Sequence, residues 1–299
     1  MKPVSKLIMA LLLCGSLAAC GGDSGDDTST VSLRVTDAPI DDTVSVVVQF
    51  IEVRLRNTNG AWTSYPVNPP RSIDLLKLQG TNTADLLVDK PADVGDYDEI
   101  RLLVDSTPMM NFIDLGTAGR VELKIPSGSS SGLKIKGDFS VLEKRPTSLV
   151  LDFDLRRSIT FAGNSGNYIL KPVIRLINDA DAGSIRGTVN SALLSNMPAC
   201  SDADPKTYNA VYAYSGHNVT PDDIDLGSNQ NVEPFATTSI AWDDTSMRFL
   251  YEIAFLPAGD YTIALTCNAD AENLDDGNDD LKFFNIQNVT VVVNNTLFL

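Results

Sequence analysis

The sequence predicts an all-β fold in which two β-sandwich domains, Ig-like or prealbumin-like, follow one another. Three observations support this fold class. Nearly every apolar segment alternates with a period of two, which places every second side chain on one face of a strand. Glycine, proline, asparagine and aspartate separate these segments at short intervals, as tight turns require. A polar break at Asn178–Gly183 divides the segments into two groups, so we expect two sandwiches.

The first domain is predicted over residues 31–178. Alternation begins at Val31–Val35 and resumes at Val44–Val48, and its phase changes at Phe50–Ile51, which indicates a β-bulge. Asn59-Gly60 predicts a hairpin turn into a strand that carries Trp62. A short helix is expected at Ile73–Leu78. The other strands predicted here are Ile100–Val104, Val121–Ile125, Leu149–Leu155 and Tyr168–Ile177.

The second domain is predicted over residues 184–299, after a linker at residues 179–183. The segment Gly183–Val189 is predicted to form the first strand of this domain. Leu256–Ile263 is predicted to contain a turn followed by another strand. Its Ala258–Tyr261 is similar to Val94–Tyr97 of the first domain. In both we expect the glycine to provide the backbone angle of a tight turn and the tyrosine to start a buried strand face.

The amino terminus resembles the signal peptide of bacterial lipoproteins. Lys2 and Lys6 precede an apolar run, Leu7–Cys14, which is much shorter than the roughly 20 residues that span a bilayer. Leu17–Gly21 then resembles a lipobox, which implies that residues 1–19 are removed and that Cys20 carries three acyl chains. Residues 20–30 predict a flexible tether. Gly21, where an aspartate would retain such a protein in the inner membrane, implies the outer membrane, facing either the periplasm or the cell surface.

Charge and cysteine content restrict the partners and the compartment. The formal net charge is −16, and cleavage would make it more negative because Lys2 and Lys6 are lost. Such a chain is repelled by phosphate backbones, so nucleic acid is not an expected partner. With Cys14 in the leader and Cys20 lipidated, Cys200 and Cys267 remain. Two thiols in an exported protein predict a disulfide.

Residues 31–178 resemble the bacterial family called domain of unknown function 4382. The similarity is carried by an ordered series of short motifs. They are Thr36–Pro39, Gly60–Trp62, Ile73–Leu76, Val94–Tyr97, Ile125–Gly128, Leu151–Asp154, Arg157-Ser158 and Leu170–Ile174. This family has no assigned activity, so the resemblance implies domain limits and a secreted lipoprotein context and identifies no catalytic residue.

The second domain resembles the carboxypeptidase-regulatory or transthyretin-like β-sandwich module. Gly183–Val189 and Leu256–Ile263 carry this resemblance in the expected order. Gram-positive modules of this kind form a lysine–asparagine isopeptide bond. Arg186 stands where the lysine would be needed, so that crosslink is not expected and the cysteine pair would replace it. Sugar binding is implied only by analogy of fold.

An acidic loop near the carboxyl terminus is the candidate metal site. Its calcium-ligand candidates are Asp270, Asp275, Asp276, Asn278 and Asp280, with Glu272 and Asp279 between them. Calcium takes several oxygen ligands from flexible loops. The EF-hand pattern fails because no glycine stands at the sixth position from any plausible first aspartate and no glutamate closes the loop. A solvated acidic loop without an ion is the alternative interpretation.

Other motifs have structural interpretations. Gly128–Gly132 fits the GxSxG pattern, but an alternating strand follows where a nucleophile elbow needs a helix. His217, the single histidine, is expected in a surface loop. The Asp152–Arg157 segment is expected to form ion pairs with neighbouring strands. Trp62 and Trp242 could stack on sugars or fill a core.

The sequence therefore predicts no catalytic residues and no required cofactor. The favoured function is a non-enzymatic, lipid-anchored envelope protein with a surface for adhesion, for glycan or protein binding, or for scaffolding. The expected partners are the membrane, through the lipid anchor, and a glycan or envelope protein. A secreted hydrolase with an Asp/Glu-based site and a calcium-dependent structural module are the alternatives.

Overall fold

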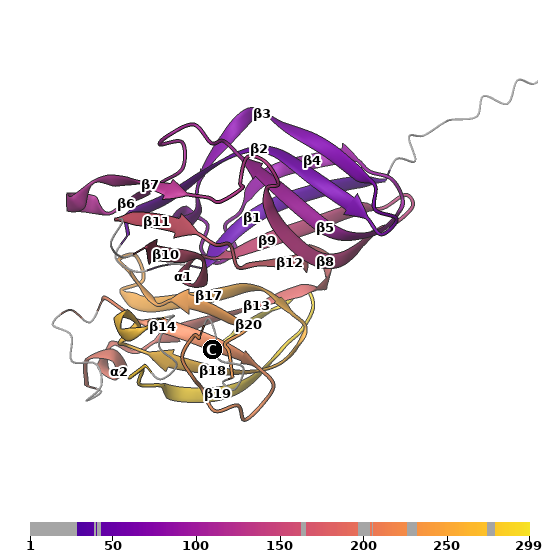
Figure 1. Ribbon diagram of the computed structural model, residues 1–299. Helices are drawn as coiled ribbons and strands as arrows, with labels where there is room; N and C mark the ends of the chain where they lie inside the picture. Colours follow the sequence, from indigo (N-terminus) through magenta and orange to yellow (C-terminus); the bar gives the residue numbers. More distant parts are fainter. Residues whose placement is uncertain are drawn as a thin grey trace, which may run out of the picture.

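The protein is described from a computed structural model, which defines residues 29–38, 40, 43–162, 166–196, 204, 206–225, 232–273 and 279–299. Within these residues the fold is all-β, as predicted: four sheets contain nearly all regular structure. Figure 1 shows strands β1–β12, coloured indigo to magenta-red, above the orange and yellow strands of the second half. We call these halves the first and second sandwich.

The first sandwich consists of one sheet with the order β12-β9-β1-β4 and a larger sheet with the order β10-β11-β7-β6-β2-β5-β8, in which β3 also pairs with β2. Its strands are β1 (Thr30–Ala38), β2 (Ser45–Asn57), β3 (Trp62–Asp74), β4 (Ala84–Pro91), β5 (Gly95–Val104), β6 (Phe112–Asp114), β7 (Arg120–Lys124), β8 (Leu133–Val141), β9 (Pro146–Asp154), β10 (Ile159–Ala162), β11 (Asn167–Leu170) and β12 (Ile174–Asn178).

The second sandwich consists of two sheets with the orders β16-β17-β13-β20 and β15-β14-β18-β19. Its strands are β13 (Ala182–Val189), β14 (Ala210–Ser215), β15 (Ala236–Ser239), β16 (Ala241–Asp243), β17 (Arg248–Pro257), β18 (Gly259–Thr266), β19 (Phe284–Val291) and β20 (Thr296–Phe298). Helical turns connect the strands: α1 (Leu155–Ser158), α2 (Ser191–Asn196), η1 (Leu75–Lys77), η2 (Gly116–Ala118), η4 (Asp179–Asp181) and η5 (Ala269–Ala271).

Each sandwich encloses its own apolar core. In the first, alternating residues of β1 and β9 pack against those of β2, β5 and β8, and Phe50 meets Phe153 edge to face with 6.2 Å between ring centroids. In the second, Ile185 of β13, Phe249 of β17 and Ile263 of β18 belong to one buried cluster. The period-two alternation therefore marks the inward face of each sheet, since side chains alternate across a strand.

Two local predictions in the first sandwich are confirmed. The register of β2 against β3 shifts between Phe50 and Glu52, which is the bulge that the change of phase indicated. Residues Thr58–Gly60 form the turn between β2 and β3, and Gly60 has a φ of 88°. Only glycine adopts such an angle without steric cost, so the Asn59-Gly60 pair explains the hairpin.

The repeated Gly-Asp-Tyr motif has the same structure in both sandwiches. Gly95 and Gly259 have φ values of 146° and 158° and begin β5 and β18. Tyr97 donates its hydroxyl to the Asp93 carbonyl at 2.9 Å, and Tyr261 donates to the Pro257 carbonyl at 2.9 Å. Both rings are buried. Each motif is thus a tyrosine corner, which fixes the start of a core strand.

Three local predictions are wrong in extent. The expected helix at Ile73–Leu78 is only η1, because Ile73 still belongs to β3. The expected strand Leu149–Leu155 ends at Asp154, where α1 begins. The expected strand Tyr168–Ile177 is divided into β11 and β12. Pro172 lies in the gap and has no N–H for a ladder hydrogen bond.

The connection between the sandwiches is shorter than the linker expected at residues 179–183. It is the turn η4, and β13 already begins at Ala182. Gly183 lies inside β13, where a Cβ atom would stand 2.3 Å from the Val292 carbonyl oxygen. Only glycine permits this approach of the two backbones.

The two sandwiches contact each other through α1 and β12. Arg156 of α1 donates to the Ala269 carbonyl at 3.2 Å, and Arg157 donates to the Pro234 carbonyl. The guanidinium of Arg175 in β12 lies 4.6 Å from the ring centroid of Phe235. Among the described residues, no helix has the length and apolar character needed to cross a membrane.

Candidate functional site

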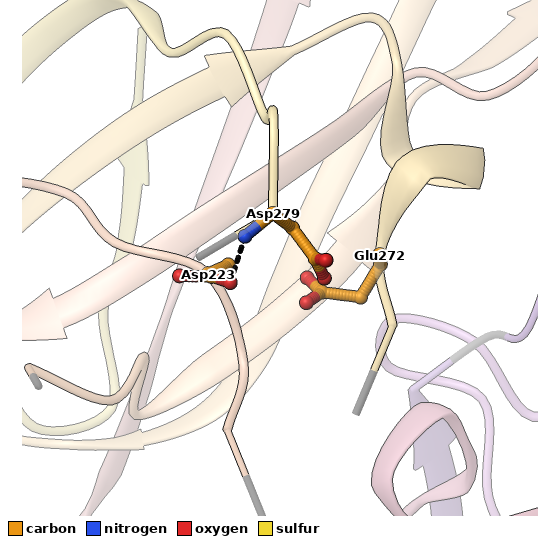
Figure 2. A group of neighbouring side chains, drawn as sticks. All are labelled: Asp223, Glu272 and Asp279. Atoms are coloured by element: carbon orange, nitrogen blue, oxygen red, sulfur yellow. Dashed lines mark hydrogen bonds between the residues drawn. The ribbon is translucent and has the colours of Figure 1, made fainter. Parts of the chain in front are cut away.

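Three carboxylates from two loops converge at one edge of the second sandwich. Asp223 follows β14, whereas Glu272 and Asp279 come from the segment between η5 and β19. One oxygen from each of the three lies within 4.8 Å of the others. Figure 2 shows the carboxylates gathered together, with the Asp279 backbone N–H donating to Asp223 at 2.8 Å. We call this group the carboxylate cluster.

Protein donors already satisfy part of the carboxylate cluster. Tyr212 donates its hydroxyl to Glu272 at 2.6 Å, and the Ile224 backbone N–H donates to the other Glu272 oxygen at 2.9 Å. Burial raises the pKa of Glu272 to about 7; these hydrogen bonds and the nearby Arg156 act against the shift, and Asp279 adds to it. The cluster therefore reduces its excess negative charge either by holding a proton near neutral pH or by binding a cation.

The predicted calcium ligands are not gathered as expected. Asp270 and Asp280 are exposed, and Asp280 forms an ion pair with Lys282. Asp275, Asp276 and Asn278 lie outside the described residues. Of the acidic loop, only Glu272 and Asp279 enter the cluster, and Asp223 joins them from almost 50 residues earlier in the chain.

Glu272→Gln is expected to remove a pH dependence of stability. Because the folded pKa is raised to about 7, the folded state binds more protons than the unfolded state between about pH 4.5 and pH 7. Wild-type stability should therefore fall by about 2 kcal/mol as the pH rises through this window, whereas the variant's curve should be flatter. Urea unfolding between pH 4.5 and 8 measures this difference.

The control is Asp270→Asn, which changes an exposed acid outside the cluster. It should leave the pH profile unchanged. A rise in Tm with millimolar Ca²⁺ that Glu272→Gln abolishes would show that the cluster holds an ion instead of a proton.

A second group of polar side chains surrounds a small cavity between the sandwiches. This cavity of about 20 Å³ is lined by Asp37, Asp152 and Arg175 of the first sandwich and by Thr237 of the second. Both Asp37 oxygens, Nη1 of Arg175 and Oγ1 of Thr237 are buried without a hydrogen-bond partner in the described structure. The volume suffices for one water molecule, which could satisfy several of these groups.

Asp37 and Asp152 differ in whether a positive charge offsets the charge of the carboxylate. Arg175 donates to Asp152, directly opposite it in the sheet. Asp37 has no such partner. Burial raises the pKa of Asp37 well above its usual value, the charges of Asp152 and Asp154 add to the shift, and the nearby Leu155 backbone N–H opposes it. Asp37 is thus the less well compensated acid of the interface.

A surface opening of the second sandwich lies beside Trp242. It has a volume of about 380 Å³ and is lined by the end of β13, the start of α2 and the turn that joins β16 to β17. Trp242 packs edge to face on Phe249 with 4.9 Å between centroids. Its Nε1 donates to Asp244 at 2.8 Å. We call this opening the Trp242 pocket.

The remaining sequence candidates occupy surface or structural positions. Residues 126–131 form a turn between β7 and β8, so Gly128–Gly132 lies in a loop between two strands. His217 lies in a loop of the second sandwich, where its Nε2 is 3.1 Å from the Val289 carbonyl oxygen. Asp152 forms an ion pair with Arg175 of the neighbouring strand β12, as the structural interpretation predicted. Asp154 forms its ion pair with Arg157, three residues further along its own segment.

Two of the sequence predictions concern residues outside the described structure. Cys267 is buried just after β18, but Cys200 lies outside the described residues, so the disulfide stays a prediction. Cys20 also lies outside them, and lipidation stays a prediction.

Sequence reasoning missed Asp37 and Asp223 as members of polar clusters. Asp223 is 2% exposed, although it stands in the acidic segment Asp222–Asp225, which looks solvated. Asp37 stands near the end of β1, where a polar residue usually marks the end of a strand and is exposed. One signal was present in the sequence. Asp37 occupies the next inward position after Val31, Leu33 and Val35, so its side chain continues the buried face of the strand.

Residues 28–172 match a known family model. It is described as "Domain of unknown function (DUF4382)". The DUF4382 match covers β1 through β11 and ends just before β12, which agrees with the resemblance seen in the sequence. Among curated proteins, none matches this chain.

Solved structures align with the chain at low similarity. The TIE protein of Bacillus anthracis is 10% identical with a TM-score of 0.20, over 90% of this chain and 33% of that one. A fimbrial protein of Bacteroides ovatus is 11% identical with a TM-score of 0.20, over 91% and 48%. A candidate cell adhesion protein of Bacteroides fragilis is 10% identical with a TM-score of 0.19, over 91% of each chain. This chain thus spans about a third of the length of the TIE protein and about half of the length of the fimbrial protein. Scores of this size support no inference about function.

Proposed function

We propose that this chain is a non-enzymatic lipoprotein of the bacterial outer membrane that binds a glycan in the Trp242 pocket. The observation that carries the proposal is an aromatic wall inside an opening of about 380 Å³, surrounded by hydrogen-bonding side chains. That volume lies in the range typical of small-ligand sites. The anchor at Cys20 and the outer-membrane location rest on the leader sequence.

The chemistry of the Trp242 pocket suits a sugar. Sugar rings present apolar C–H groups on one face and hydroxyls around the edge, so they pair with an indole and with polar side chains. Asn190, Ser191 and Arg248 line the pocket and are exposed. Because Phe249 and the bond to Asp244 hold the indole in place, little side-chain entropy is lost when a ligand binds.

A carboxylate-based hydrolase is less well supported by the same geometry. A glycosidase needs two carboxyl groups on either side of the scissile bond, and among the described residues that line the Trp242 pocket there is no aspartate or glutamate. Asp37 and Asp152 do share a cavity, but its volume of about 20 Å³ does not admit a sugar.

Trp242→Ala is expected to lower glycan affinity by about tenfold. A nucleobase stacked on an aromatic ring contributes about 1–3 kcal/mol, and we expect a sugar ring on the indole to contribute at the lower end of that range. The measurement is binding of the folded protein to a panel of oligosaccharides that includes peptidoglycan fragments and lipopolysaccharide core. A Trp62→Phe background makes Trp242 the single indole, so fluorescence titration reports on this pocket directly.

The matched control is Phe161→Ala, which removes an aromatic ring that is 55% exposed on the first sandwich. It should bind as the wild type does. Equal affinity of Trp242→Ala and wild type for every saccharide in the panel would refute the proposal.

A further inference from the structure

The acidic charge of this chain is concentrated in its second half. Residues 31–178 contain 17 lysines and arginines and 18 acids, whereas residues 179–299 contain 4 and 18. The first sandwich is thus nearly neutral. Over distances beyond about 10 Å salt screens charges, so the first sandwich can carry a basic surface in spite of the net charge of −16.

Basic residues form a row across three adjacent strands of the first sandwich. Arg54 of β2 stands opposite Arg101 of β5, which stands opposite Lys134 of β8. Directly opposite residues share a face of the sheet, and Val53, Leu102 and Leu133, adjacent in sequence to these three, are buried on the other face. Like charges that face each other across strands are destabilising, and ion pairs with Glu52, Asp98 and Glu99 offset the repulsion among the arginines. Lys134 has no such acid among the described residues.

A second row lies one step along the same strands. Trp62 of β3 stands opposite Arg56 of β2, which pairs with Glu99 of β5, and Glu99 stands opposite Lys136 of β8. The two rows together make a surface of five basic residues and one exposed indole. We call it the basic face, defined by Trp62, Arg54, Arg56, Arg101, Lys134 and Lys136.

The arginines of the basic face are held in fixed positions by acids of the same strands. Arg54 donates to Glu52 through Nε and Nη2, and Arg56 donates to Asp98 at 2.8 Å. Glu99, only 3% exposed, accepts from Arg101 at 2.7 Å and lies 3.0 Å from Arg56. Arg101 also stacks on Trp62 with 4.3 Å between its Cζ and the ring centroid. Its bond to Glu99 uses Nε, which leaves the two Nη groups for another acceptor. A guanidinium held in this way is ready to bind a carboxylate in bidentate geometry.

The two lysines of the basic face lie on β8, next to the arginines of β5. Lys134 and Lys136 are exposed, and neither forms an ion pair within the described part of the chain. Exposed acids, Asp96 and Asp138, lie toward the far end of the same strands and limit the face in that direction. Since strands lie about 4.8 Å apart, Arg54, Arg101 and Lys134 span about 10 Å.

We propose that the basic face binds a carboxylate-bearing polysaccharide, such as a chain of uronic acids. Charge complementarity selects an anionic partner, and the spacing of Arg101, Lys134 and Lys136 lets neighbouring carboxylates of one linear chain meet these cations. Arg101 favours planar carboxylates through its two Nη groups, whereas Arg54 and Arg56 already bind Glu52, Asp98 and Glu99. This surface belongs to the first sandwich and is separate from the Trp242 pocket, so it adds a second glycan contact to the proposed function and does not depend on it.

The test is titration of the full mature chain with polygalacturonate at low and high salt, with neutral dextran as the uncharged comparison. We expect binding to polygalacturonate that weakens with salt and no binding to dextran. Lys134→Gln with Lys136→Gln should weaken binding by about tenfold, because each lost ion pair is worth up to about 1 kcal/mol. Trp62→Ala should weaken it too, since Arg101 loses its stacking partner.

The matched control is Lys90→Gln with Lys171→Gln, which removes the same charge from exposed positions outside the basic face. It should keep wild-type affinity, and so should Trp242→Ala, which separates this proposal from the first. Equal loss in both double variants, or binding to dextran as strong as to polygalacturonate, would overturn the proposal. So would binding to phosphatidylglycerol vesicles but not to polygalacturonate, which would assign the face to lipid headgroups.

Discussion

Replacing Asp37 by asparagine is expected to stabilise the protein by about 1–2 kcal/mol at pH 7.5, although it changes a buried residue. Asp37 is 5% exposed, and neither of its oxygens has a hydrogen-bond partner in the described structure. Its folded pKa is raised by burial and by Asp152 and Asp154, so the stability that its neutral form contributes is present at acidic pH. It is lost as the pH rises above about 4, the unfolded value.

The stability difference between variant and wild type should therefore be small at pH 4 and should grow toward pH 7.5. Urea unfolding at both pH values measures it. Asp152→Asn is the matched comparison, because Asp152 is equally buried but accepts from Arg175. That variant should be destabilised by about 3 kcal/mol, since it leaves the arginine without its acid. Destabilisation by Asp37→Asn at pH 7.5 would mean that the ionised form is bound by a ligand in the cavity.

Cys20→Ala is expected to move essentially all of the protein from the membrane fraction to the soluble fraction. The prediction rests on the resemblance of Leu17–Gly21 to a lipobox. Each buried methylene contributes about 0.8 kcal/mol and several acyl chains together give stable attachment, so loss of the acylated thiol removes the only anchor that the leader predicts. Fractionation of cells followed by immunoblotting measures the distribution.

Cys14→Ala is the control for this experiment, since it removes a thiol from the apolar part of the leader. It should leave the protein with the membrane. Mass spectrometry of the wild-type protein should find an acylated amino terminus at Cys20. Retention of Cys20→Ala in the membrane, or an uncut and unmodified terminus, would contradict the lipoprotein assignment.

Local features of the fold could be predicted where a short pattern has one physical cause. The change of phase at Phe50–Ile51 identified the bulge in β2, and the Gly-Asp-Tyr motifs predicted the two glycine turns and the buried tyrosines that follow them. Alternation failed at Tyr168–Ile177, because apolar residues continue through Pro172 while the backbone ladder cannot. It also failed to show α1, a single turn that Asp154 caps by accepting from the Arg157 N–H.

The candidate sites depended on contacts between distant residues. The acidic loop between Cys267 and Phe283 was recognised from composition, but its partner Asp223 lies on another loop. The row Arg54, Arg101 and Lys134 has no counterpart in sequence spacing, because it exists only through the register of β2, β5 and β8. Asp37 and Thr237 meet across the contact between the sandwiches, 200 residues apart.

The sequence by itself determined the all-β class, the main turns, the polar break after β12 and the expected lipid anchor. Each of these follows from neighbouring residues, through side-chain alternation, glycine conformation or the order of basic, apolar and small residues. Only the tertiary structure decided which carboxylates gather in one cluster, which cations form a row and which acid is buried without a hydrogen-bond partner among the described residues. Those properties depend on strand order, register and burial, since charges interact over a few ångströms of space whatever their separation along the chain.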